Sequence, residues 1–249
     1  MTLLERHWRL ALVLVATLVT FRNVTGLPFT IVDDPTWVVH NPLVADPFGQ
    51  GIVELLRTTS MAYPHGVTVL SLALDRALYG TEPAGYHATS LLVHLLNVLL
   101  VYVLALRFDA GARASAAAAA LFALHPIVVE PVCWVIGRKD LLATTLLLAG
   151  LLVLAGRRDA DRRIGVLRWI GGDLLCIAAM LAKPSAITAP GLVWVALRCL
   201  RPTEPIWRVA CGVAPQLLAG LLVVLTGVPG LQAQGAVVER SRLGVVWDI

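Results

Sequence analysis

Two adjacent carboxylates, Asp33 and Asp34, stand a few residues after the first long apolar segment of the chain. An ionised group near hydrocarbon loses hydration and neighbouring like charges repel, so such a pair is costly to keep beside a bilayer. A carboxylate at a membrane face can remove the proton of a hydroxyl group. The pair is therefore the first candidate for chemistry in this sequence; the alternative is that both carboxylates only solvate a loop beside Pro35.

The composition indicates which class of protein must hold these residues. Apolar residues make up 58% of the 249 residues, charged residues make up 14%, and the mean hydropathy is +0.79. An ordinary soluble domain carries about 25% charged residues. We therefore expect an all-α polytopic membrane protein. The basic residues cluster in short loops between apolar segments, which indicates membrane orientation rather than nucleic-acid binding.

The apolar segments predict about seven membrane-spanning helices, because a helix needs about 20 apolar residues to cross the hydrocarbon. They are expected near residues 8–21, 86–106, 114–124, 141–155, 166–182, 187–197 and 209–228. The third and sixth are short, so they are expected to be tilted, incomplete or re-entrant. The first is expected to be retained, because no small-x-small cleavage site follows it.

The basic residues predict the orientation of these spans. With the N-terminus in the cytoplasm, about twelve of the 20 basic residues fall in short inner segments, in line with the positive-inside rule. Asp33 and Asp34 then lie on the outer side. The alanine- and arginine-rich composition favours a bacterial inner membrane; in a eukaryote we would expect the endoplasmic reticulum.

The first outer loop, residues 22–85, is the long connection of this topology. Ile52, Leu55 and Leu56 recur at helical spacing, and a second apolar-rich stretch runs over residues 67–78. Both are expected to form helices that lie on the membrane surface or cap the spans. Residues 1–230 are thus expected to form one transmembrane domain, and residues 231–249 a polar tail at an incomplete C-terminus.

Several sequence blocks at the ends of the spans give a resemblance to a known family. They comprise Asp33-Asp34, Val38-Val39-His40-Asn41-Pro42, Thr68-Val69-Leu70-Ser71, Phe122-Ala123-Leu124-His125-Pro126 with Glu130, Gly137-Arg138-Lys139-Asp140-Leu141-Leu142, and Leu181-Ala182-Lys183. Over residues 31–190 the chain resembles the transmembrane-and-tetratricopeptide-repeat O-mannosyltransferases and their bacterial relatives, which belong to the GT-C superfamily.

The resemblance implies a GT-C-like fold and a polyprenyl-phosphate-sugar-dependent glycosyltransferase. Such an enzyme moves a sugar, here expected to be mannose, to an acceptor hydroxyl, expected to be a protein Ser or Thr, with inversion at the anomeric carbon. In the family the acid of the first loop is the base, which favours Asp33. Because adjacent residues of an extended segment point to opposite sides, Asp34 would orient the acceptor or pair with a cation.

The leaving phosphate needs positive charge or hydrogen-bond donors, and the resemblance makes Arg138, Lys139, Lys183 and His65 candidates to bind it. Arg138 and Lys139 could equally be interfacial cations whose charged ends reach water, and His65 could be an ordinary loop histidine. Lys183 lies at the outer end of the fifth predicted span, against the inward bias of the basic residues, which favours a functional role. Asp140 could neutralise the two cations before it.

Three residues, His125, Glu130 and Asp140, are expected to line the substrate cavity. His125 and Glu130 do not share a helical face well, because they are five positions apart, and His125-Pro126 is also a chain-reversal signal. No cofactor is expected to be required. No metal ligand is predicted either, although a divalent metal held by His125, Glu130 and the aspartate pair stays conceivable.

Polar residues inside the predicted spans are expected to serve packing. His87 and His94 fall on one helical face and are expected to bond to a neighbouring helix. Asp173 is expected to pair with an inner-loop arginine, Arg163 or Arg168. The four cysteines show no metal-binding spacing and are interpreted as small buried hydrophobes.

Departures from the family pattern leave a second function open. His65 stands where the family has Arg, Pro184 follows Lys183 where it has Glu, and no tetratricopeptide repeats follow. The alternative is a truncated or degenerate homologue that acts as a non-catalytic membrane partner subunit. A transporter is disfavoured because the ionisable residues gather at one membrane face. The enzyme's expected partners are the lipid bilayer, the polyprenyl-phosphate sugar and an acceptor polypeptide or glycan, without nucleic acid; the oligomeric state stays open.

Overall fold

The computed structural model describes residues 3–49, 59–60, 63–156, 162–200, 202–203 and 205–225. In this part of the chain the regular structure is helical, apart from two two-residue strands, β1 (Thr59–Ser60) and β2 (Tyr63–Pro64), which pair antiparallel. The predicted all-α class is confirmed. The tail over residues 231–249 and the predicted helix around residues 52–56 lie outside the described residues.

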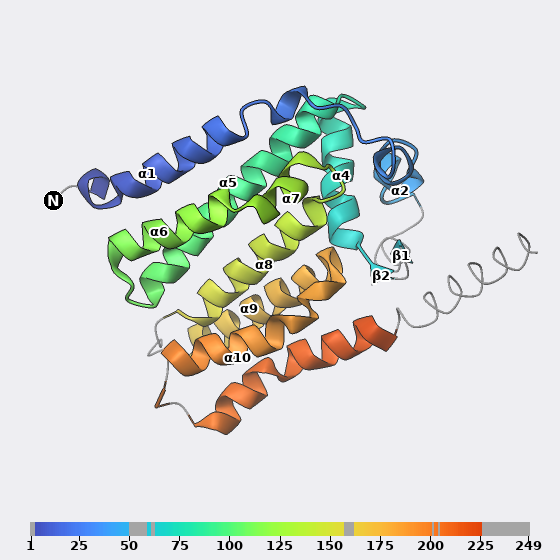
Figure 1. Ribbon diagram of the computed structural model, residues 1–249. Helices are drawn as coiled ribbons and strands as arrows, with labels where there is room; N and C mark the ends of the chain where they lie inside the picture. Colours follow the sequence, from blue (N-terminus) through green and yellow to red (C-terminus); the bar gives the residue numbers. More distant parts are fainter. Residues whose placement is uncertain are drawn as a thin grey trace, which may run out of the picture.

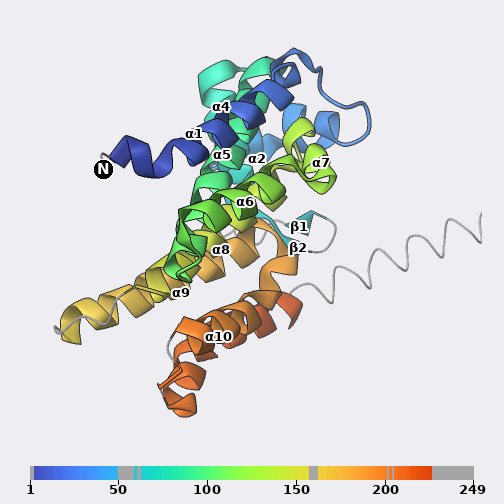
Figure 2. The same cartoon turned by 60° about the vertical axis from the view of Figure 1, so that its left-hand side comes forward.

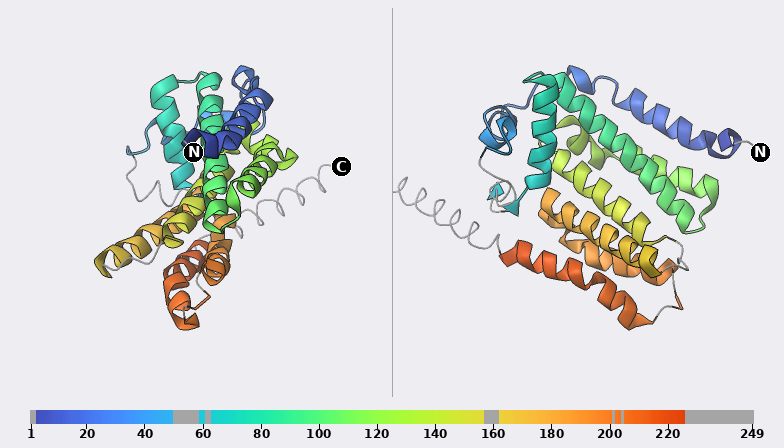
Figure 3. Two further views of the ribbon diagram at one scale, coloured as in Figure 1. Left: turned by 90° about the vertical axis from the view of Figure 1, so that its left-hand side faces the viewer. Right: turned by 180° about the vertical axis from the view of Figure 1, so that it is seen from behind.

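The long helices run side by side and each reverses the direction of the one before it (Figures 1 and 3). They are α1 (Leu3–Thr20), α5 (Pro83–Arg107), α6 (Gly111–Leu124), α8 (Arg138–Leu154), α9 (Arg162–Ala182), α10 (Ala189–Leu200) and the helix Ile206–Leu225. Each overlaps one predicted span. The first and last lie on opposite sides of the bundle (Figure 2).

The predicted count of about seven spans is not confirmed by the lengths of these helices. Four helices in the described part of the chain are long and apolar enough to cross a membrane, within residues 7–26, 83–107, 165–182 and 206–225. A fifth span results if α6 and the helical turn after it, bent by 52°, count as one. Helices α8 and α10 have only 17 and 12 residues, which falls short of the usual hydrocarbon thickness.

A further helix, α4 (Gly66–Tyr79), lies across one end of the bundle, at a large angle to the long helices (Figure 1). The helix predicted over residues 67–78 is therefore confirmed. It ends at Gly80, whose φ of +63° is a conformation that glycine adopts without steric cost. We call this the loop end of the molecule; it also carries residues 22–49 and the turns between α6 and α8 and between α9 and α10.

Prolines start the short helical elements of the loop end. Each stands in the first turn, where its missing N–H costs no hydrogen bond and its fixed φ suits a helix. The elements are η2 (Pro35–Val39, a π-helical turn), α2 (Pro42–Ala45), η3 (Pro126–Val128) and η4 (Pro184–Thr188). The loop end also holds η1 (Val24–Gly26) and α7 (Val129–Cys133).

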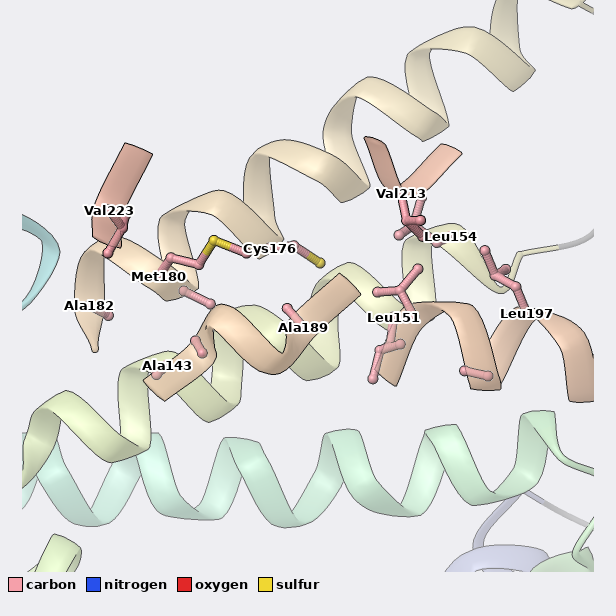
Figure 4. Packing of buried hydrophobic residues seen from close by; sticks show 14 of the residues in the cluster. Ala143, Leu151, Leu154, Cys176, Met180, Ala182, Ala189, Leu197, Val213 and Val223 are labelled. Atoms are coloured by element: carbon pink, nitrogen blue, oxygen red, sulfur yellow. The ribbon is translucent and has the colours of Figure 1, made fainter. Parts of the chain in front are cut away.

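Helices α8 and α9 approach closely because small residues face each other. A Cβ atom at Gly150 would lie 2.7 Å from Cys176 Sγ and 3.1 Å from the carbonyl oxygen of Gly172. Around this contact Leu151, Met180 and further apolar side chains from α8, α9, α10 and the last helix form one buried cluster (Figure 4). Small residues at helix contacts are the usual way in which membrane helices gain packing energy.

Buried polar side chains join helices elsewhere in the bundle. Asn97 Nδ2 on α5 donates to the carbonyl of Leu141 on α8 (3.0 Å), and the Thr145 hydroxyl donates to Asn97 Oδ1 (2.7 Å). His94 Nε2 lies 3.2 Å from the carbonyl oxygen of Ala123 on α6, so His94 bonds a neighbouring helix as expected. Asp173 accepts a hydrogen bond from Gln216 (2.8 Å), which was not predicted, and its pairing with Arg163 or Arg168 stays a prediction.

Candidate functional site

Asp34 is a fully buried carboxylate with three hydrogen bonds. Its Oδ2 accepts from the backbone N–H and the hydroxyl of Thr30, at 2.8 and 3.0 Å. Its Oδ1 accepts from the backbone N–H of Ile136, at 3.3 Å, in the turn before α8. Asp34 therefore ties the first loop to the N-terminus of α8, two segments that are 102 positions apart.

Asp33, by contrast, is only partly buried. Its backbone carbonyl accepts from Trp37 N (2.9 Å), but its carboxylate makes no hydrogen bond or ion pair with any residue that the structure describes. Ile31 and Val32, directly before it, are 93% and 82% exposed. The two carboxylates have different environments, as expected, and the assignment of Asp33 as base stays a prediction.

Arg138 begins α8 and is 0% exposed. It forms an ion pair with Asp75 of α4. Its other donors reach Ser90 Oγ (3.2 Å), Ser71 Oγ (3.4 Å) and the carbonyl of Tyr86 (2.5 Å). The guanidinium thus joins α8 to both α4 and α5, so its contacts hold the three helices together.

Asp75, the partner of Arg138, did not emerge from the sequence reasoning. Its Oδ1 also accepts from the Thr89 hydroxyl (2.9 Å). Burial raises the pKa of the Asp75 carboxyl, against the opposing effect of the Arg138 charge. A signal was present in the sequence, because Asp75 is the single acid within the apolar stretch 67–78.

Lys183 and Asp140 form an ion pair between the end of α9 and the first turn of α8. The two side chains stay 31% and 35% exposed. Directly before Lys183, the carbonyl oxygen of Ala182 lies 3.2 Å from His65 Nδ1 and accepts from the Thr68 hydroxyl (3.0 Å). Three predicted site residues are therefore brought together here from distant parts of the chain.

Lys139 is partly buried, and its Nζ lies 5.8 Å from the centre of the Trp134 ring, within the range of a cation–π contact. The turn between them is tight at Gly137, where a Cβ atom would lie 3.0 Å from both Pro131 Cα and the carbonyl oxygen of Trp134. The turn thereby places Lys139 next to the Arg138 network, without an acidic partner among the described residues.

His125 and Glu130 lie at the same end of the molecule, on the exposed turn between α6 and α8. His125 Nδ1 accepts from the backbone N–H of Ile127 (3.2 Å), which is the capping role that a chain-reversal signal predicts. No hydrogen bond or ion pair joins either residue to the other site candidates within the described ranges. Within those ranges no group of three or more His, Cys, Asp or Glu could hold a metal ion.

Comparison with known proteins confirms the family resemblance. The chain is 37% identical over 122 residues to protein O-mannosyl-transferase Tmtc1 of Drosophila melanogaster, 49% of this chain and 14% of the fly protein. It is 31% identical over 159 residues to protein O-mannosyl-transferase TMTC3 of Mus musculus, 62% of this chain and 16% of the mouse protein. It is 29% identical over 192 residues to protein O-mannosyl-transferase TMTC1 of Homo sapiens, and this match covers 66% of this chain and 21% of the human protein.

The chain therefore matches only about a fifth or less of each relative's own length. No protein-family model matches the chain, and no solved structure does.

Proposed function

We propose that this chain carries the sugar-transfer site of an integral-membrane glycosyltransferase. The enzyme moves mannose from a polyprenyl-phosphate donor to the hydroxyl of a protein Ser or Thr, with inversion. The observation that carries the proposal is Asp33, a partly buried carboxylate with no partner among the described residues, beside a fully buried Asp34 that secures its loop. The relatives' names, protein O-mannosyl-transferases, supply the class of reaction.

The proposed step is one displacement at the anomeric carbon. The acceptor oxygen bonds to that carbon while the bond to the phosphate oxygen breaks, and the polyprenyl phosphate leaves with both electrons of that bond. The Asp33 carboxylate takes the proton of the acceptor hydroxyl as the new bond forms. Attack from the face opposite the phosphate inverts the anomeric configuration.

Positive charge stabilises the leaving phosphate, and we assign this role to Lys139 and Lys183. Both ammonium groups belong to partly exposed residues at the loop end. Arg138 was a candidate by resemblance, but its fully buried guanidinium already neutralises Asp75. A phosphate that binds at Lys183 competes with Asp140 for the ammonium group. His65, whose ring contacts the carbonyl oxygen of the neighbouring Ala182, contributes a further hydrogen-bond donor to the phosphate when the ring is protonated.

His125 and Glu130 are exposed at the loop end, and we assign them to the rim that receives the acceptor. The N-terminus of α1 is at the opposite end of the bundle, together with the end of α5 and the start of α6 (Figure 1), which carry Arg107 and Arg113. By the positive-inside rule that end is cytoplasmic and the loop end faces outward.

The test is a transfer assay with the purified chain in lipid nanodiscs, radiolabelled polyprenyl-phosphate mannose and a lysate of acceptor polypeptides. We expect the wild type to transfer label and Asp33→Asn to lose transfer by at least about 100-fold, the low end for removing a general base. The unfolding midpoint of Asp33→Asn should equal that of the wild type, because its carboxylate holds nothing in place.

The matched control is Asp109→Asn in the turn between α5 and α6, at the other end of the bundle. Asp109 has φ of +55°, a conformation that asparagine also tolerates, so this variant should keep full transfer. No transfer by the wild type would favour the non-catalytic partner subunit, and equal transfer by wild type and Asp33→Asn would reject Asp33 as the base.

A further inference from the structure

We propose that Arg138 and Asp75 are positioning residues of the transfer site: they fix α4 across the loop end, and through α4 they hold Lys183 where it meets Asp140. The inference rests on the proposed function for its activity readout. Its structural readout is independent of that function.

The buried guanidinium of Arg138 joins three helices. Arg138 belongs to α8, contacts Asp75 and Ser71 on α4, and contacts Ser90 and the carbonyl of Tyr86 on α5. A buried charge that loses its partner is strongly unfavourable, whereas a satisfied pair keeps its elements in one arrangement. The position of α4 therefore depends on this pair.

The other end of α4 contacts the end of α9. His65 and Thr68, at its start, both contact the carbonyl oxygen of Ala182. That carbonyl ends α9, and the next residue is Lys183. The first turn of α4 therefore fixes the point at which the chain leaves α9.

The ion pair of Lys183 with Asp140 completes a closed ring of contacts through α8, α4 and α9. Lys183 pairs with Asp140, which stands two positions after Arg138 in the first turn of α8. The ring runs from Arg138 through Asp75 and α4 to Ala182, then through Lys183 and Asp140 back to α8. If the Arg138–Asp75 contact is lost, α4 loses its ion pair with α8, and His65 and Thr68 are no longer held from that side against the carbonyl of Ala182.

The two possible roles of Arg138 make opposite predictions for a double variant. Arg138→Met alone leaves the Asp75 carboxylate buried without its partner. Arg138→Met combined with Asp75→Leu replaces the pair by apolar groups, an exchange that proteins often tolerate. A positioning role predicts that the double variant recovers function; a phosphate ligand at Arg138 predicts that it cannot.

The test uses two readouts on the full chain in nanodiscs. Nitroxide labels attached through Leu78→Cys on α4 and Ser185→Cys after α9, both exposed, report the α4–α9 distance distribution by pulsed electron paramagnetic resonance. The three cysteines that are not buried, Cys133, Cys199 and Cys211, are replaced by alanine. The second readout is KM and kcat for radiolabelled polyprenyl-phosphate mannose.

We expect a narrow distribution for the parent, a broad one for Arg138→Met, and a narrow one again for the double variant. The kcat/KM of Arg138→Met should fall by about 100-fold, which is the effect of a misplaced group. This fall should come from a higher KM for the donor, and the double variant should recover the kcat/KM of the parent. Asp173→Asn, a buried acid bonded to Gln216, is the control and should leave the distance unchanged.

Two results would overturn the inference: a narrow distribution in Arg138→Met, or a double variant that regains the narrow distribution but not donor binding. If the wild type transfers no sugar, the proposed function fails, while the distance measurements alone still decide whether the pair positions α4.

Discussion

At the scale of single residues, the two neighbouring carboxylates have different environments. Asp34 is buried and accepts three hydrogen bonds, whereas the Asp33 carboxylate has no partner in the described part of the chain. The Asp34 carboxylate therefore holds two distant segments together, whereas the Asp33 carboxylate holds none, and it is the one that we propose as the base.

The first prediction concerns the stability of these two positions. Asp34→Ala leaves the N–H groups of Thr30 and Ile136 without their acceptor, so we expect the free energy of unfolding to fall by about 1–3 kcal/mol. Asp33→Ala removes no such bond and should change it by less than about 0.5 kcal/mol. Denaturant unfolding in detergent micelles measures both; equal losses would show that the two carboxylates do not differ in this way.

The second prediction concerns Lys139 as a ligand of the donor phosphate. Lys139→Met removes the charge and keeps the length of the side chain, so we expect KM for the donor to rise about tenfold, the value of one charge-assisted hydrogen bond, with kcat less affected. Lys139→Arg keeps both the charge and the contact with the Trp134 ring and serves as the control. An unchanged KM in Lys139→Met would leave the ammonium group a purely interfacial cation.

At the scale of the helical elements, the loop end depends on contacts between segments that are distant in sequence. The first loop bonds to the turn before α8 through Asp34, and α4 bonds to α8 and α9 through Asp75 and Thr68. The long helices fix the relative positions of these segments, because α8 and α9 are in close contact at Gly150 and Gly172. The site therefore depends on helix packing some distance away from it.

The third prediction tests that packing with two adjacent glycines of α9. A Cβ atom at Gly172 would lie 2.4 Å from Leu154 Cγ, whereas one at Gly171 would meet nothing within 4 Å. We expect Gly172→Ala to lower the free energy of unfolding by about 1–3 kcal/mol through overpacking. Gly171→Ala should raise it by up to about 1 kcal/mol through helix propensity.

The comparison of these two variants in one unfolding assay is internally controlled, because the residue types and the helix are the same. If both variants gain stability, α8 and α9 are not in close contact at this point.

At the scale of the whole molecule, charge separates the two ends of the bundle. The loop end holds the acids and the few cations of the proposed site, and the other end carries arginines near the ends of its helices, such as Arg107 of α5, Arg113 of α6 and Arg198 of α10. In a bilayer this asymmetry decides which end stays in the cytoplasm. For the proposed function, the same asymmetry predicts that donor and acceptor reach Asp33 from the outer side.

The fourth prediction is the topology itself. A membrane-impermeant maleimide applied to intact cells should label Thr36→Cys, which is exposed at the loop end, but not the native Cys199, which is exposed at the other end of the bundle. Cys199 should react only after permeabilisation. Labelling of Cys199 but not of Thr36→Cys in intact cells would place Asp33 in the cytoplasm and reject the proposed direction of transfer.

Much of the fold was predictable from the sequence because its signals are local. Apolar segments placed the seven long helices, and the apolar-rich stretch over residues 67–78 identified α4. The count of about seven spans is not confirmed, because α8 and α10, with 17 and 12 residues, are short for a membrane-crossing helix. Apolar character sets where a helix forms, but its length decides whether it spans.

Local sequence patterns suffice to predict the class of protein, the helix positions and the residues that gather at one end of the bundle, because hydropathy and turn residues act within a few positions. The charges that meet follow from how the helices pack: Arg138 pairs with Asp75, and Lys183 pairs with Asp140, which is 43 positions away. No local pattern encodes such pairs, since partners at a bundle end are chosen by how the helices pack. The same packing leaves the Asp33 carboxylate without a hydrogen bond or ion pair to the residues that the structure describes.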